Sequence, residues 1–154
     1  RIESVTSAER PELLLGRPVE CEFEVVRWRG VDPAVVRNAP FMRDGTPMPT
    51  LYWLCDPPLR AAVSRIESAG GVHAAAAAVA PEVIAATHAA YAAERDALID
   101  QGHVGPRPTG GVGGTRTGLK CLHAHVAYAF SGADDPVGAW TLQQIDGDVI
   151  AGLR

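Results

Sequence analysis

Residues 118–131 read GLKCLHAHVAYAFS, and this stretch predicts the element around which the rest of the chain packs. On a helical wheel with about 3.6 residues per turn, apolar side chains form one stripe and alanines cover most of the remaining surface. The stripe consists of Leu119, Leu122, Val126 and Phe130. We therefore expect a central, buried helix over residues 118–131. Its polar side chains need partners from other segments, so it is the first place to look for a site.

The segments before this helix predict a small antiparallel sheet followed by helices. Residues 21–29 and 34–38 have the pattern of a β-hairpin with an irregularity at Val25-Val26, and residues 50–55 are rich in β-forming side chains. Helices are expected up to Leu15, over 57–70, 72–80 and 81–101, and over 136–144. The order predicts an α+β fold with about three strands and four to six helices, in a single domain over residues 1–154. The tail after residue 145 is expected to be loose.

Composition argues against several classes of protein. The net charge is −4 and no run of Lys or Arg is present, so the counterion release that drives nucleic-acid binding has no source. No apolar stretch approaches the length of about 18 residues that a membrane helix needs, and no signal-peptide pattern is present. The 3 cysteines have long spacings and do not form a disulfide framework. We expect a cytoplasmic protein that binds neither nucleic acid nor membrane.

The first candidate chemistry is a metal site. Cys121 and His125 are four positions apart on the expected helix and can face one ion, with Cys55 at a strand end as a third ligand. On the same wheel, the side chains of Cys121 and His123 point about 160° apart. No cofactor follows with certainty from the sequence, and zinc is the candidate. Buried, inert cysteines are the alternative.

The second candidate chemistry is nucleophilic catalysis. Cys55 directly precedes a helix N-terminus, and Cys121 lies beside Lys120, the only lysine of the chain, near the start of another helix. Positions of this kind favour a thiolate, and His123 could then act as the base. The alternative is that His123 is a hydrogen-bonded histidine of the core.

The third candidate chemistry is anion binding. Residues 109–118, TGGVGGTRTG, place flexible backbone amides just before a helix, with Arg116 and Lys120 beside them. The loop is not a P-loop, because Leu119 stands where that motif requires lysine. A mobile lid, a backbone wrapped closely around another group and a disordered surface loop are the structural alternatives. The residues expected to contact a ligand are Arg37, Thr46, Thr50, Tyr52, Arg65, Gly113, Gly114 and Arg116.

Several of these segments together resemble a known family. VVRNAP at 35–40, DGTPMPTLYWLC at 44–55 and AAVSRIESAG at 61–70 resemble the core of bacterial domain-of-unknown-function family 501, and LKCLH at 119–123 resembles its second signature. The resemblance implies a small cytoplasmic protein of actinobacterial type, often encoded near an exopolyphosphatase-like gene and a cell-division gene, with no established activity. It also implies an apolar residue at the position of His125, which argues against a metal ligand there. The family pattern falls on Arg37, Pro40, Gly45, Thr46, Pro47, Pro49, Thr50, Tyr52, Arg65, Lys120, Cys121 and His123.

Three hypotheses of function follow. The leading one is a site for a small anionic ligand, such as a phosphorylated molecule, where residues 46–55 meet the glycine-rich loop and the central helix, with hydrolase or transferase activity. The alternative is a non-enzymatic module that uses residues 40–53 to bind a protein partner linked to cell division or polyphosphate metabolism. The third is a structural zinc domain held together by Cys55 and Cys121. Whether the protein is an enzyme is left open.

Overall fold

The strands form one antiparallel sheet. The computed structural model describes residues 3–6 and 21–154. The strand order is β1-β2-β3-β4, with β1 at Glu3–Thr6, β2 at Glu22–Arg29, β3 at Asp32–Asn38 and β4 at Tyr52–Leu54. The pairing of β2 with β3 shifts register between Val25 and Trp28, where the sequence pattern predicted an irregularity. The sheet has one strand more than expected, and the helix expected up to Leu15 falls almost wholly outside the described residues.

The rest of the described chain is mainly helical, which confirms the α+β class. The helices are α1 (Pro57–Ser68), α2 (Gly71–Ala78), α3 (Pro81–Asp96), α4 (Leu122–Phe130), α5 (Pro136–Gln143) and α6 (Gly147–Ala151), and a short 3-10 turn, η2, spans Val112–Gly114. Asp56 and Asp135 begin α1 and α5 as expected, because their side chains accept backbone N–H groups of the first turn. Helix α3 ends before the expected residue 101.

The C-terminal tail is ordered, so the expectation of a loose tail is wrong. Residues 147–151 form α6, and the backbones of Trp28 and Arg154 exchange hydrogen bonds of 2.8 and 2.9 Å. Val149 and Leu153 also pack against the hydrophobic core. Burial of these apolar residues holds the tail against the core, so that its end pairs with strand β2.

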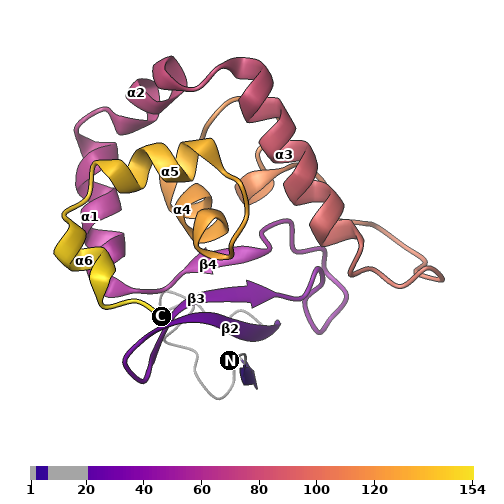
Figure 1. The fold of residues 1–154 in the computed structure, drawn as a ribbon. Coiled ribbons are helices and arrows are strands. Elements are labelled where there is room, and N and C mark those ends of the chain that lie inside the picture. The colour runs from indigo at the N-terminus through magenta and orange to yellow at the C-terminus, as the bar shows by residue number, and fades with distance from the viewer. Residues whose placement is uncertain (1–2, 7–20) are drawn as a thin grey trace.

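Helix α4 lies in the middle of the molecule, as predicted. Figure 1 shows it above β4, behind α5 and between α1 and α3. Leu122, Val126 and Ala127 are completely buried. The helix begins four residues later than expected, because Gly118 has a positive φ of 67° and Cys121 is extended, with φ −145° and ψ 126°. Cys121 is therefore the N-cap residue of α4 rather than part of its first turn.

The glycine-rich loop is held against α3 by hydrogen bonds to its backbone. Arg95 is 1% exposed and donates to the carbonyl oxygens of Pro108 and Gly110. His88 accepts from the Val112 N–H and bonds to the carbonyl oxygen of Gly118. A Cβ atom at Gly111 would collide with the His88 side chain. Of the alternatives for this loop, the structure shows a backbone wrapped closely around buried side chains.

The three tyrosines pack together where β4, α3 and α4 meet. The ring of Tyr128 stacks on Tyr52, with centroids 5.7 Å apart, and meets the edge of Tyr91 at 4.8 Å. The Tyr91 hydroxyl oxygen accepts the backbone N–H groups of Leu51 and Tyr52. This cluster attaches the short strand β4 to the helical layer and so fixes one wall of the site.

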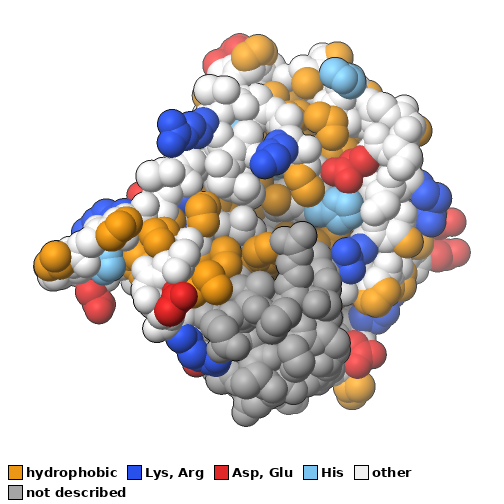
Figure 2. Space-filling view, turned by 180° about the vertical axis from the view of Figure 1, so that it is seen from behind, with side chains coloured by type: hydrophobic (Ala, Val, Ile, Leu, Met, Phe, Trp, Pro, Cys, Tyr) orange, Lys and Arg blue, Asp and Glu red, His pale blue; other side chains and the backbone are white. Residues whose placement is uncertain are grey.

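None of the described helices is both long and apolar enough to cross a membrane. On the face shown in Figure 2, the Lys and Arg side chains of the described residues stand apart from one another, while hydrophobic side chains gather along the projecting arm after α3.

Candidate functional site

A pocket of about 340 Å³ lies between β4, α1, the glycine-rich loop and the start of α4. Its volume falls within the usual range for small-molecule sites, roughly 300–1,000 Å³. Residues from these four segments line it, and they are Thr50, Tyr52, Trp53, Leu54, Arg60, Ser64, Gly113, Lys120, Cys121, His123 and Ala124. This is the place where the leading hypothesis put a site.

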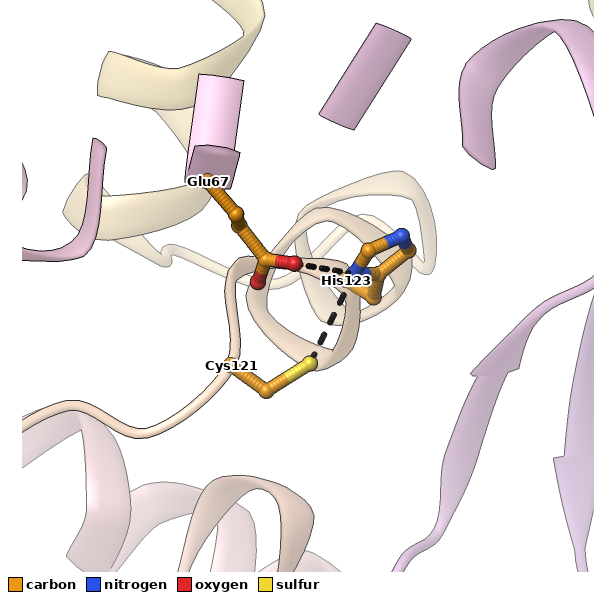
Figure 3. Close-up of side chains that lie close together, drawn as sticks. All are labelled: Glu67, Cys121 and His123. Carbon is orange, nitrogen blue, oxygen red and sulfur yellow. Dashed lines mark hydrogen bonds and ion pairs between the residues drawn. The ribbon is translucent and has the colours of Figure 1, made fainter. Parts of the chain in front are cut away.

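Three side chains with chemically active groups, Glu67, Cys121 and His123, lie close together (Figure 3), and the last two of them line the pocket. Nδ1 of His123 lies 3.1 Å from Oε1 of Glu67 and 3.7 Å from Sγ of Cys121. Glu67 comes from the last turn of α1, Cys121 caps α4, and His123 lies in the first turn of α4. Because Cys121 is extended, its side chain turns toward His123, and the expected separation of about 160° between these residues is wrong.

Glu67 also determines where α4 begins. Cys121 makes no side-chain capping bond, and the Leu122 N–H instead donates to Oε2 of Glu67 over 2.7 Å. A carboxylate at a helix N-terminus satisfies a free N–H group and interacts favourably with the helix dipole. One carboxylate thus holds the start of α4 with one oxygen and faces His123 with the other.

The other nitrogen of His123 faces a backbone carbonyl. Nε2 lies 3.3 Å from the carbonyl oxygen of Arg60 and 3.2 Å from Oγ of Ser64. Since a carbonyl oxygen can only accept, this partner assigns a hydrogen to Nε2. The pKa of His123 is raised above its ordinary value, chiefly by the hydrogen bond with Cys121, with further contributions from the charge of Glu67 and the Arg60 carbonyl.

Two positively charged side chains, Arg60 and Lys120, line the same pocket. No described carboxylate forms an ion pair with either of them, and none is among the lining residues. Nε of Arg60 and Nε1 of Trp53 are buried and have no hydrogen-bond partner among the described residues. Buried donors without acceptors are costly, and the two charged side chains give the pocket a positive lining.

The structure brings together six of the residues that the sequence put forward. Thr50, Tyr52 and Gly113 line the pocket with the three residues expected to be catalytic, Lys120, Cys121 and His123. The alternative for His123, a hydrogen-bonded histidine of the core, describes part of its setting, since the ring is hydrogen-bonded but its side chain keeps 23% of its surface exposed.

The remaining expected ligand-binding residues lie elsewhere. Arg37 is paired with Glu24 across β2 and β3 at 2.8 Å, and Arg65 is exposed and borders a hollow near α6. Thr46 is exposed in the loop before β4, and Arg116 is exposed beside α3. Gly114 does not line the pocket, and a Cβ atom at this position would lie 3.2 Å from the Pro49 side chain. The sequence could not separate these positions, because similar polar segments border several hollows.

The expected metal set of Cys55, Cys121 and His125 is not brought together. His125 is buried and its Nδ1 lies 2.8 Å from Oδ2 of the buried Asp135, which links α4 to α5. Cys55 is buried behind β4, where burial raises its thiol pKa to about 12. Its expected role as an activated thiol at a helix N-terminus is therefore wrong. Among the described residues, the group with metal-ligand spacing is Glu67, Cys121 and His123.

Sequence reasoning missed Arg60, Ser64 and Glu67. These residues follow the spacing i, i+4, i+7, so they share one face of α1. The buried face of α1 is formed by Leu59, Ala62 and Val63. A polar face beside such an apolar face is usually solvated, so this pattern alone does not place the three residues in a site. The signal available in the sequence was that three polar residues share one face of a helix, while the LKCLH signature elsewhere contains a histidine that needs polar partners.

The family comparison agrees with the sequence resemblance. The model of the family described as "Protein of unknown function (DUF501)" matches residues 25–143, which include every residue of the pocket. No curated protein and no solved structure matches the chain. The match extends over most of the 154 residues, and the chain belongs to the DUF501 family.

Proposed function

We propose that the pocket binds a small anionic molecule bearing a phosphate or carboxylate group, and that the protein is a hydrolase acting on it. One observation carries this proposal: Arg60 and Lys120 line a pocket whose wall also holds Cys121 and His123. Charge-assisted hydrogen bonds from an arginine and a lysine suit an anion, and charged donors in a partly enclosed site act more strongly than in open water.

The positions of the two charged side chains suit binding of an anion next to the reactive groups of the pocket. Lys120 is exposed, whereas Arg60 is half-buried on α1, one turn before Ser64. If the phosphate or carboxylate group of a ligand were held between them, the bond to be hydrolysed would lie near the cluster of Glu67, Cys121 and His123. Holding a substrate beside reactive groups is itself a large part of catalysis.

The pocket is also suited to binding because its walls are fixed. The tyrosine cluster holds β4, and Arg95 and His88 hold the loop that contributes Gly113. A ligand that enters a preformed pocket loses less free energy to ordering than one that must organise flexible segments.

Calorimetric titration with inorganic phosphate, pyrophosphate and a panel of phosphate monoesters tests the proposal. Arg60→Met and Lys120→Met should each weaken binding about tenfold or more, the usual value of a charge-assisted hydrogen bond. Arg65→Met is the matched control, since Arg65 lies on the same helix but outside the pocket, and it should bind like the wild type. Equal affinity of all three variants would contradict the proposal, provided their circular dichroism spectra show that they are folded.

The alternative of a protein-binding module stays a prediction. Its expected surface, residues 40–53, is partly occupied within the protein, because Leu51 and Tyr52 are buried and Phe41 stacks on His103 with centroids 4.3 Å apart. If no anion binds, capture of a stoichiometric partner that depends on Phe41 and Met48 would favour this alternative.

A further inference from the structure

The geometry points to a binding site for a single Zn²⁺ ion formed by Glu67, Cys121 and His123, with one coordination position left for water or substrate. The inference rests on the proposed function only for what the metal would do in the pocket, not for its binding. Carboxylate, thiolate and imidazole are all ligands of zinc, and catalytic zinc sites typically use three protein ligands and keep a fourth position open.

The distances between the ligand atoms match those of a tetrahedral zinc site. Zinc bonds of about 2.3 Å to sulfur and about 2.0–2.1 Å to nitrogen and oxygen place S and N about 3.6 Å apart, and N and O about 3.4 Å apart. The observed separations are 3.7 Å from Cys121 Sγ to His123 Nδ1 and 3.1 Å from that nitrogen to Glu67 Oε1. The three ligand atoms all lie within 4.8 Å of one another.

The hydrogen bonds around the cluster prepare each ligand atom for a metal. The Arg60 carbonyl places a hydrogen on Nε2 of His123, which leaves Nδ1 as the nitrogen with a free lone pair in the neutral ring. That lone pair faces a carboxylate oxygen, and two acceptors at 3.1 Å require a proton or a cation between them. The Leu122 N–H fixes the other oxygen of Glu67. Metal-bound histidines usually donate their second N–H to such a carbonyl, and bound carboxylates are usually held in this way.

The position of the cluster leaves the metal open to the pocket. Cys121 and His123 line the pocket, and Ser64, Arg60 and Lys120 surround the same space. On binding, the Cys121 thiol loses its proton to solvent and becomes the thiolate ligand. The open position would hold a water molecule. Zinc lowers the pKa of bound water to about 7, so the site would supply a hydroxide near neutral pH. That hydroxide could attack an ester whose anionic group is held by Arg60 and Lys120. In this arrangement, Cys121 is a ligand and not a nucleophile.

Titration of the chelator-treated protein, prepared without a polyhistidine tag, with Co²⁺ and then Zn²⁺ tests the site. We expect one Co²⁺ per chain, with the near-ultraviolet charge-transfer absorption of a cobalt–thiolate bond, and displacement of that ion by Zn²⁺. Cys121→Ser should abolish the absorption. His123→Gln and Glu67→Gln should weaken metal binding by about 10–100-fold or more. Loss of a residue that only hydrogen-bonds to a metal ligand already costs this much, and these two residues are ligands themselves.

The variants are chosen so that misfolding cannot produce the expected result. Glu67→Gln keeps an oxygen to accept the Leu122 N–H, and His73→Gln on the exposed side of α2 is the matched histidine control. Absence of micromolar zinc binding by the wild type, or equal binding by folded Cys121→Ser, would overturn the inference. Zinc binding without phosphate binding would support the metal site and reject the anion pocket. Phosphate binding without zinc binding would do the reverse.

Discussion

The imidazole of His88 accepts a hydrogen bond of 3.0 Å from the backbone N–H of Val112, and this bond joins α3 to the glycine-rich loop. The same ring reaches the Gly118 carbonyl oxygen over 2.7 Å, so one side chain holds both ends of the segment that carries Gly113 into the pocket. A loop of this composition is otherwise expensive to order, because glycine loses more backbone entropy on folding than other residues.

Replacing His88 with alanine should therefore destabilise the protein. The change leaves the buried Val112 N–H without an acceptor, which costs about 1–3 kcal/mol of unfolding free energy. Urea unfolding followed by circular dichroism measures this, with His73→Ala as the exposed control, expected to stay within about 0.5 kcal/mol of the wild type. Equal stability of the two variants would show that the loop does not depend on His88.

The tyrosines should titrate far above their ordinary range. Burial is the main cause that raises the pKa of Tyr52 from 10.0 to about 12, that of Tyr128 to about 12, and that of Tyr91 upward as well. The charge of Glu94 contributes at Tyr52 and Tyr128, and Tyr52 donates a 2.6 Å hydrogen bond to it. Because the chain has only these 3 tyrosines, the native protein should show little phenolate absorption at pH 10, where the unfolded chain is half ionised.

These shifts also determine how stability depends on alkaline pH. A raised pKa in the folded state means that the native protein binds protons more tightly than the unfolded chain between pH 10 and about 12. The stabilisation is therefore complete below pH 10 and is lost as the pH rises through the folded-state values. Tyr128→Phe should reduce this loss, and phenolate absorption that develops fully near pH 10 in the native protein would contradict the account.

The three cysteines should differ in their reactivity. Burial raises the thiol pKa of Cys21 to about 11 and that of Cys55 to about 12, whereas Cys121 is only partly buried. Alkylation by iodoacetamide at about pH 8 requires an accessible thiolate, so Cys121 should be modified first and the other two only on unfolding. Peptide mass spectrometry gives the order. Simultaneous modification of Cys55 and Cys121 would be the contrary result.

Asp135 should contribute more to stability than its neighbour Asp134. Asp135 is buried, caps α5 by accepting the N–H groups of Val137 and Gly138, and bonds to His125. Asp135→Ala should cost about 2–4 kcal/mol, because it removes the cap and leaves the buried imidazole without its partner. The exposed Asp134→Ala should change the unfolding free energy by less than about 0.5 kcal/mol in the same thermal or urea measurements. A similar effect of both variants would refute this role of Asp135.

The central helix shows what sequence periodicity can and cannot predict. The apolar stripe correctly predicted that residues around Val126 are buried in the middle of the fold. The start of the helix was missed because its first N–H is capped by Glu67, a residue of another helix that no local pattern reveals. The same error placed Cys121 on one helix face with His125 and away from His123, so the predicted metal set shares only Cys121 with the cluster of Glu67, Cys121 and His123.

The pocket was found for a different reason. Thr50 and Tyr52 belong to a polar, proline-rich segment, and Lys120 follows a glycine-rich one. Segments of this composition indicate a site rather than core packing, and all three residues line the pocket. Arg37 and Arg116 belong to segments of the same kind but face other surfaces, and only the pairing of strands and the course of the loop decide which way they point. The sequence located the region and six of the residues that line the pocket, but it could not exclude nearby polar residues that face other surfaces.

The glycine-rich loop is held through backbone atoms of Pro108, Gly110, Val112 and Gly118, and this has a consequence for how the family can diversify. The side chains that hold these atoms, His88 and Arg95, both belong to α3, so substitutions at exposed positions between Val112 and Gly118 leave these hydrogen bonds intact. The exposed side chains at 116 and 117 can change without moving the pocket wall. Members of the family can therefore vary the side chains at these exposed positions while keeping the same pocket wall.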